Sequence, residues 1–231
     1  MNKNSIRKIF LSLILLLTSQ AAFSSAILST SPSVIQAPIP SSLQKDVLQS
    51  NTTIFAYQER QGVLLNSGLL VNYMGTGTYH PALTNEAATL LISAGAIVDS
   101  YLFHFDMFFL GTGIRSLGTI TFDSDILGII GSHNPLVSTD ALLGNPGTLY
   151  ETTTPTFGGR GLEGANFSAA LSRDWVTISG DRRTLTLDLG VGEWFDDVRV
   201  VVDGQAQAVP LPATLPLVLI GFVTLLASRH K

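Results

Sequence analysis

Thr184-Leu185-Thr186-Leu187-Asp188-Leu189 is the stretch that decides the fold, because polar residues and leucines alternate in it without exception. Successive side chains of a β-strand point to opposite faces, so this period of two places all three leucines on one face. We therefore expect a strand at 184–189, with its leucine face toward a hydrophobic core and its polar face toward solvent.

Comparable short runs occur on the N-terminal and C-terminal sides of this strand. They are rich in β-branched and aromatic residues, and Gly, Asn, Asp or Pro separates them. The runs cover 54–57, 63–65, 69–71, 97–109, 118–122, 126–130, 175–178 and 198–202. Helical patterns are limited to 85–92 and 138–143. Many short strands with few helices predict an all-β fold, a single antiparallel β-sandwich of jelly-roll-like type over residues 52–208.

The segment before this body, residues 27–51, has a different composition. Ser, Thr, Pro and Gln dominate it, with prolines at 32, 38 and 40. A segment with so few large apolar side chains has little surface to bury. We therefore expect 27–51 to be a disordered lead-in.

The N-terminus has the features of a secretory signal peptide. Lys3, Arg7 and Lys8 form a basic region, an apolar run follows at 9–17, and small residues lead to Ser24 and Ala26. This order predicts a signal peptide over 1–26, cleaved after Ser24 or Ala26. An uncleaved anchor is the alternative, but the apolar run has about half of the ~20 residues that a membrane-spanning helix needs.

The C-terminus has three parts that together indicate a membrane-directed tail. The first is the box Val209, Pro210, Leu211, Pro212 and Ala213, the second is the apolar run 215–227, and the third is Arg229, His230 and Lys231. From residue 211 to 227 a helix would measure roughly 26 Å, slightly less than the ~30 Å of a hydrocarbon core. Long basic side chains extend the reach of such a helix to the interface. We expect a transmembrane helix at 214–228, with the basic end in the cytoplasm.

This tail, residues 209–231, resembles the PEP-CTERM sorting signal of Gram-negative bacteria in its Val-Pro-Leu-Pro-Ala variant, with Leu211 where the eponymous motif has Glu. The resemblance implies recognition by an exosortase, an integral-membrane enzyme that would cleave near the box. It also implies a surface or matrix protein of an exopolysaccharide-producing bacterium. A plain C-terminal anchor is the alternative. A glycosylphosphatidylinositol signal fits less well, because it needs a polar spacer and an apolar end.

The charge distribution and the absence of cysteine exclude several classes of function. All 17 Asp and Glu lie between Asp46 and Asp203, whereas the ends of the chain are basic, so the body between them carries eight Lys and Arg and a net charge of −9. An acidic body argues against nucleic acid and anionic lipid as partners. Without cysteine there is no disulfide, thiolate nucleophile or Cys-ligated metal.

Two groups of residues are candidate metal ligands. Asp123 and Asp125 follow a predicted strand and offer hard oxygen ligands for Ca²⁺, although a turn stabilised by the Asp side chains is the simpler interpretation. His104 and Asp106 share one face of a strand, and His80 or His133 would have to complete a zinc site. The simpler interpretation here is a polar strand face. We expect no cofactor, with calcium at Asp123 and Asp125 as the one alternative.

No catalytic motif stands out in the sequence. There is no G-x-S-x-G, and the glycine-rich stretches at 111–113 and 158–161 do not form a nucleotide-binding motif. Aromatic residues near predicted turns could stack on sugar rings, or they could pack in the core. They are Tyr73, Tyr79, His80, Tyr150, Phe157, Trp175, Trp194 and Phe195.

These observations predict a non-enzymatic protein. We expect an exported cell-surface or extracellular-matrix protein of a Gram-negative bacterium, associated with exopolysaccharide or biofilm, that is held transiently in the inner membrane and processed by an exosortase. The first alternative is a carbohydrate-binding module of the exopolysaccharide matrix. The second alternative is a secreted hydrolase.

Overall fold

The computed structural model describes residues 25–81, 86–108, 113–153, 159–164, 173–192 and 194–204. The predicted signal peptide up to Ser24 and the predicted sorting signal at 209–231, with its transmembrane helix 214–228, lie outside the described residues. No helix within the described ranges is long and apolar enough to cross a membrane.

The first of two five-stranded sheets is antiparallel throughout. Its order is β1 (Ile27–Thr30), β9 (Ile114–Phe122), β13 (Thr184–Val191), β12 (Trp175–Ile178) and β6 (Gly77–Tyr79). The central strands β9 and β13 pair over eight residues, which is the longest ladder of this sheet. The predicted strand at 184–189 is therefore confirmed as part of β13.

The second sheet carries the residues of the candidate site. Its order is β10 (Ile126–Ile130), β14 (Asp196–Asp203), β8 (Ile97–Phe105), β4 (Ile54–Leu64) and β2 (Val34–Gln36). All neighbours are antiparallel except β2 and β4, which are parallel. β14 and β8 pair along the whole of β14.

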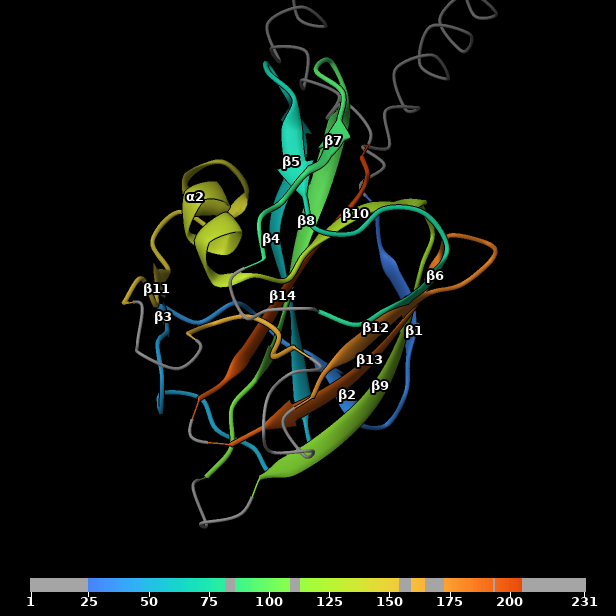
Figure 1. Ribbon diagram of the computed structural model, residues 1–231. Coiled ribbons are helices and arrows are strands. Elements are labelled where there is room, and N and C mark those ends of the chain that lie inside the picture. The colour runs from blue at the N-terminus through green and yellow to red at the C-terminus, as the bar shows by residue number, and fades with distance from the viewer. Residues whose placement is uncertain are drawn as a thin grey trace, which may run out of the picture. The chain divides into compact units, whose positions relative to one another are not determined.

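One helix and two short strand pairs cover part of the second sheet (Figure 1). Helix α2 (His133–Leu143) packs against β4. Strands β11 (Leu149–Tyr150) and β3 (Ser42–Leu43) form a parallel pair, and β5 (Leu69–Val71) and β7 (Leu90–Ile92) form an antiparallel pair.

The two large sheets share one hydrophobic cluster. From the first sheet, Leu185, Leu187 and Leu189 are fully buried in it, as their alternation with polar residues predicts. From the second sheet, Phe103 of β8 and Val200 of β14 belong to the same cluster. The fold is thus mostly β with antiparallel sheets, which confirms the predicted fold class at this level.

The second sheet is also covered on its other face, and this decides where charged residues can lie. Leu102 of β8 and Val201 of β14 pack in a second cluster with Leu136 and Leu143 of α2. Since both faces of β8 and β14 are covered, nearly every residue of these strands is buried. Polar residues at alternate positions of these strands must therefore find partners inside the protein.

Three sequence predictions need correction or extension. The lead-in 27–51 was expected to be disordered but contains β1, β2 and β3. Its backbone N–H and C=O groups form hydrogen bonds with distant strands such as β9 and β4. Leu90–Ile92 forms strand β7 instead of part of a helix at 85–92. The helix expected at 138–143 is present but begins earlier, at His133, where Pro135 fits the first turn.

Candidate functional site: a carboxylate cluster and an arginine network, both buried

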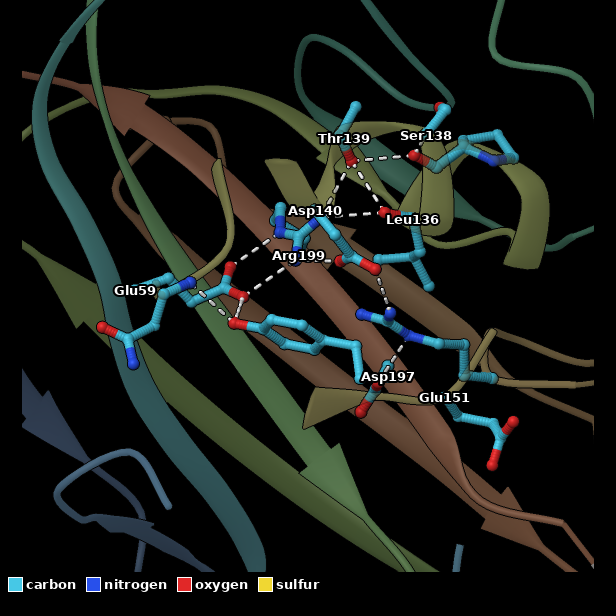
Figure 2. A network of polar contacts seen from close by, with 12 residues as sticks. Glu59, Leu136, Ser138, Thr139, Asp140, Glu151, Asp197 and Arg199 are labelled. Carbon is cyan, nitrogen blue, oxygen red and sulfur yellow. Dashed lines mark hydrogen bonds and ion pairs between the residues drawn. The ribbon is translucent and has the colours of Figure 1, made fainter. Parts of the chain in front are cut away.

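Five charged residues form a connected network beneath α2, which we call the arginine network (Figure 2). Its members are Glu59 of β4, Asp140 of α2, Arg160, and Asp197 and Arg199 of β14. Asp197, Arg199 and Val201 alternate along β14, so all three face α2 and not the other sheet.

Arg199 occupies the centre of this network. Its Nε and Nη2 donate to the two carboxylate oxygens of Glu59 at 2.6 and 2.8 Å, and Nη2 also donates to Asp140 Oδ1 at 2.8 Å. Its Nη1 donates to Thr139 Oγ1 and to the Leu136 carbonyl. A bidentate pair of this kind is among the stronger side-chain interactions, and here it ties α2 to the sheet.

Arg160 extends the network to a second carboxylate on β14. Its Nε donates to Asp197 Oδ2 at 2.8 Å and its Nη1 to Asp140 Oδ2 at 2.7 Å, so Asp140 bridges both arginines. The ring of Tyr150 lies beside both guanidinium groups. Its centroid is 4.8 Å from Cζ of Arg160 and 5.7 Å from Cζ of Arg199. The Tyr150 hydroxyl donates to Glu59 Oε1 at 2.7 Å.

The network favours the ionised form of the buried carboxylate of Asp197. Burial raises the pKa of Asp197, but the charge of Arg160 and the hydrogen bond and charge of His104 outweigh it, so this pKa lies below its ordinary value. Burial alone would lower the pKa of Arg199, but Glu59 and Asp140 raise it instead. Each charged residue in the network therefore has a partner of opposite sign. These pairs connect α2 to strands β4 and β14.

A second buried cluster contains only carboxylates. It consists of Glu163, Asp174, which directly precedes β12, and Asp196, the first residue of β14. One oxygen of each side chain lies within 4.8 Å of the other two. The exposed fractions are 4% for Glu163, 2% for Asp174 and 0% for Asp196, so bulk water does not solvate these charges. We call this group the carboxylate cluster.

Backbone hydrogen bonds compensate Asp174 more fully than the other two members of the carboxylate cluster. Asp174 Oδ2 accepts from the Glu163 backbone N–H and Asp174 Oδ1 from that of Gly190, both at 2.6 Å. Within the described part of the chain, no donor reaches either oxygen of Asp196 or Oε2 of Glu163. These three oxygens are therefore buried acceptors that need a proton or a cation.

The pKa values of the carboxylate cluster are raised, whereas that of Asp197 in the arginine network is lowered. Burial raises the pKa of Asp174 to about 7. Burial raises the pKa of Asp196 and of Glu163 well above the ordinary range, and the charge of Asp174 raises both further. Three carboxylates close together in a low-dielectric site cannot all stay ionised unless positive charge joins them.

The predicted calcium ligands Asp123 and Asp125 each have a partner within the chain. Asp123 Oδ1 accepts from the Ala26 backbone N–H at 2.8 Å and from the Ser124 hydroxyl at 2.9 Å. Asp125 Oδ1 pairs with Arg183 Nε at 3.3 Å on the surface. Both side chains thus stabilise the connection between β9 and β10. In the described ranges, the carboxylate cluster is the group spaced for a metal ion.

The side chains of the predicted zinc ligands His104, Asp106 and His80 also contact other residues of the chain. His104 is buried, with Nδ1 at 2.8 Å from Asp197 Oδ1 and Nε2 at 3.3 Å from the Leu48 carbonyl. Asp106 accepts the Asp46 backbone N–H, and His80 contacts the ring of Trp175. The predicted polar face of β8 is therefore not a solvent-facing surface but part of the buried layer beneath α2.

The aromatic candidates divide between the interior and the surface. Tyr73 and Phe195 are buried, and Tyr150 belongs to the arginine network. Trp175 and Trp194 are half-buried, and each lies beside a cation. The guanidinium group of Arg115 is 4.6 Å from the ring centroid of Trp175, and Nζ of Lys45 is 4.3 Å from the ring centroid of Trp194. Tyr79 stacks on Tyr73, and Phe157 lies outside the described residues.

A groove of about 560 Å³ lies between α2 and the segment that contains β5. Its lining is mainly aliphatic, with Glu86, Asn134, Ser138 and Thr139 as polar members. No aromatic side chain lines this groove among the described residues. It therefore lacks the ring surface that usually stacks on a pyranose.

Sequence reasoning did not predict the carboxylate cluster. Glu163, Asp174 and Asp196 are separated by eleven and 22 positions, so no local motif joins them. One local signal was present, because Asp196 and Asp197 begin a strand that continues with valines, where uncharged residues are the norm. No protein-family model matches the chain, and the comparisons with curated proteins and with solved structures found no match.

Proposed function

We propose that this protein is an exported, non-enzymatic cell-surface or extracellular-matrix protein, processed at its C-terminal signal by an exosortase. The observation that carries the proposal is the pairing of a secretory leader at 1–26 with a Pro-x-Pro box, an apolar run and a basic end at 209–231. The body between these signals is proposed to be a β-sandwich that reaches the cell surface or the exopolysaccharide matrix after a transient stay in the inner membrane.

Contacts of the first described residues favour one of the two predicted cleavage sites. The Ser25 backbone N–H and hydroxyl both donate to Asp99 Oδ2, at 2.8 and 2.5 Å, and the Ala26 N–H donates to Asp123. Cleavage after Ala26 would remove these donors from Asp99, which is fully buried. Cleavage after Ser24 would retain them and place a positive α-amino group beside Asp99. We therefore propose Ser25 as the mature N-terminus.

The charged groups inside the body support a structural or binding role over catalysis. The members of the arginine network pair with one another, and the carboxylates of Glu59 and Asp197 are buried, so of its three carboxylates only that of Asp140, whose side chain is 16% exposed, reaches solvent. A general acid or base must reach the reacting atoms. This arrangement makes the secreted hydrolase the weaker alternative.

Expression of the full chain in hosts with and without an exosortase tests the proposal. With the enzyme, mass spectrometry is expected to find a mature protein that begins at Ser25 and has lost its C-terminal apolar run. A Pro210→Ala, Pro212→Ala double variant should retain the tail, whereas a Pro216→Ala control should be processed. Recovery of a chain with both ends intact from the exosortase-containing host would overturn the proposal.

A carbohydrate-binding module is the second candidate, because Trp175 and Trp194 keep part of their ring surface accessible. Rings of this kind stack on sugars with little conformational cost. A pull-down of the full chain with neutral and acidic polysaccharides, compared with Trp194→Ala and Trp175→Ala, decides between a purely structural matrix protein and a carbohydrate-binding one. Binding that is lost in either variant favours the module.

A further inference from the structure

The carboxylate cluster requires neutralisation that the described polypeptide does not provide. Both oxygens of Asp196 and Oε2 of Glu163 are buried without a hydrogen-bond donor. A buried ionised carboxylate without a partner is strongly unfavourable, and three of them repel one another as well. Two arrangements can relieve this, namely protons shared among the carboxyl groups or a cation bound between them.

The spacing of the oxygens fits a common calcium ion. Calcium binds oxygen ligands at 2.3–2.6 Å, so two ligands of one ion lie at most roughly 4.6–5.2 Å apart. The three carboxylates meet this condition, with mutual distances within 4.8 Å. Three hard oxygen donors without an imidazole or thiolate favour Ca²⁺ over zinc.

We propose that Glu163, Asp174 and Asp196 bind a calcium ion in the interior of the protein. The assignment does not depend on the proposed export or on the C-terminal signal. It also differs from the calcium site predicted from the sequence, because Asp123 and Asp125 already bind Ala26 and Arg183.

The ion would join three separate segments of the chain. Asp174 leads into β12 of the first sheet, Asp196 begins β14 of the second sheet, and Glu163 belongs to the segment 159–164 (Figure 1). Arg160 of that same segment enters the arginine network beneath α2. Calcium would thus clamp the two sheets together at one end and fix the segment that carries Arg160.

Calcium titration of the full-length chain in mild detergent, after treatment with EGTA, tests the site directly. Calorimetry is expected to detect one ion per chain with a Kd at or below about 1 mM, the weak end of the range for calcium sites. Calcium should also raise the thermal midpoint, because it binds the folded state selectively. Asp196→Asn, which keeps the shape of the side chain, should weaken binding at least tenfold.

The matched control is Asp125→Asn, which removes a surface carboxylate that the sequence suggested as a ligand. It should leave the calcium affinity unchanged. Loss of binding in Asp125→Asn, or unchanged binding in Asp196→Asn, would overturn the proposal. So would the absence of calcium binding to the wild-type protein, which would mean that shared protons neutralise the cluster. Equal affinity for magnesium would overturn the assignment to calcium.

A measurement on the wild-type protein keeps the proposal testable if Asp196→Asn does not fold. The Glu163 and Gly190 amides donate to Asp174, so calcium should slow hydrogen exchange in segments 159–164 and 173–192. Peptides that contain Asp123 and Asp125 serve as the internal reference. Protection confined to those peptides would contradict the site.

Discussion

Asp196 and Asp197 are neighbours on β14, yet their carboxylates lie in opposite electrostatic environments. Asp197 faces α2, where Arg160 and His104 contact it and hold its pKa below the ordinary value. Asp196 faces the first sheet, where Glu163 and Asp174 surround it and its pKa is raised. The alternation of a strand thus separates two equally buried carboxylates into a compensated and an uncompensated group.

The difference shows how this protein accommodates charge in its interior. In the arginine network the cations belong to the chain, and breaking one contact leaves a buried charge without a partner. In the carboxylate cluster the described residues bring three anions together, and the charge of Arg115 and two backbone N–H groups favour the ionised form of only one of them, Asp174, so we expect further compensation from protons or from ions in solution. The first group should therefore respond to mutation of its members, and the second to ions and chelators.

Arg199→Met should have the largest effect, because it leaves Glu59 and Asp140 without their central cation. The expected loss is about 3–5 kcal/mol of unfolding free energy, the typical result of breaking a buried ion pair from one side. Urea denaturation of the full chain in detergent measures it. The control is Arg183→Met, whose exposed pair with Asp125 should contribute about 0–1 kcal/mol. A loss below about 1 kcal/mol for Arg199→Met would show that the arginine network contributes little to the free energy of unfolding.

Substitution of the two neighbours on β14 should change stability in opposite directions. Asp197→Asn removes the carboxylate that contacts both His104 and Arg160, leaving Arg160 with Asp140 alone, and should destabilise the protein by about 2–4 kcal/mol. Asp196→Asn removes a buried carboxyl group that, without calcium, must either take up a proton or lie ionised beside Glu163 and Asp174, so in EGTA it should stabilise the protein by about 1 kcal/mol. Chemical denaturation in EGTA compares both with the wild type. Destabilisation of similar size in both variants would contradict the distinction between the two groups.

Calcium gives the same pair of variants a second readout. If the carboxylate cluster binds calcium, added Ca²⁺ should reverse the order of the wild type and Asp196→Asn, because only the wild type retains the full ligand set. Asp197→Asn should still gain stability from calcium, since its substitution leaves the three ligands in place. A calcium response that is lost in Asp197→Asn but kept in Asp196→Asn would place the ion on the face of β14 that is turned toward α2 and would contradict the proposed site.

Tyr150→Phe should have a moderate effect and tests the aromatic part of the network. Its hydroxyl donates to Glu59 Oε1 and accepts the Asn145 N–H at 2.8 Å, while its ring lies under both arginines. Phenylalanine keeps the ring but removes both hydrogen bonds, so we expect a loss of about 1–2 kcal/mol. The calcium affinity should not change. A Tyr150→Phe variant as stable as the wild type would show that water replaces the hydroxyl.

The difference between the sheets also explains what the sequence could predict. Leu185, Leu187 and Leu189 were predicted correctly because the other face of β13 is only partly covered, so hydrophobic alternation survives in the sequence. β14 has buried residues on both faces, since α2 covers the second one, and its alternation is accordingly weak. The alternation of a strand predicts its buried side only where the other side meets solvent.

The remaining features depend on partners that are distant in the sequence. Strand β1, with the sequence Ile-Leu-Ser-Thr, was not predicted because it is short and opens a segment rich in Ser, Thr and Pro, and its backbone pairs with the distant strand β9. Arg199 and Glu59 are 140 positions apart, and nothing local indicates that they meet. The same holds for Glu163 and Asp196, whose convergence depends on the packing of the two sheets. A charged residue inside a run of valines was the one local sign that Arg199 had a buried partner.

The smallest expected effect concerns the edge of the arginine network. His133 begins α2 and is buried next to Arg160, and burial together with the charge of Arg160 lowers its pKa. Glu151 also faces His133 and opposes this shift. The histidine therefore stays neutral in the folded protein at a pH where the unfolded chain already binds a proton.

The sign of the pH dependence follows from this difference in proton binding. Below the unfolded value of about 6.5, the unfolded state holds one proton more at this site, so stability decreases as the pH falls. The slope is at most about 1.4 kcal/mol per pH unit. Urea denaturation between pH 7.5 and about 5.5, a window around that unfolded value, should show a shallower decline for His133→Gln than for the wild type. Parallel profiles would mean that His133 gains its proton without penalty, and that the arginine network tolerates another cation at its edge.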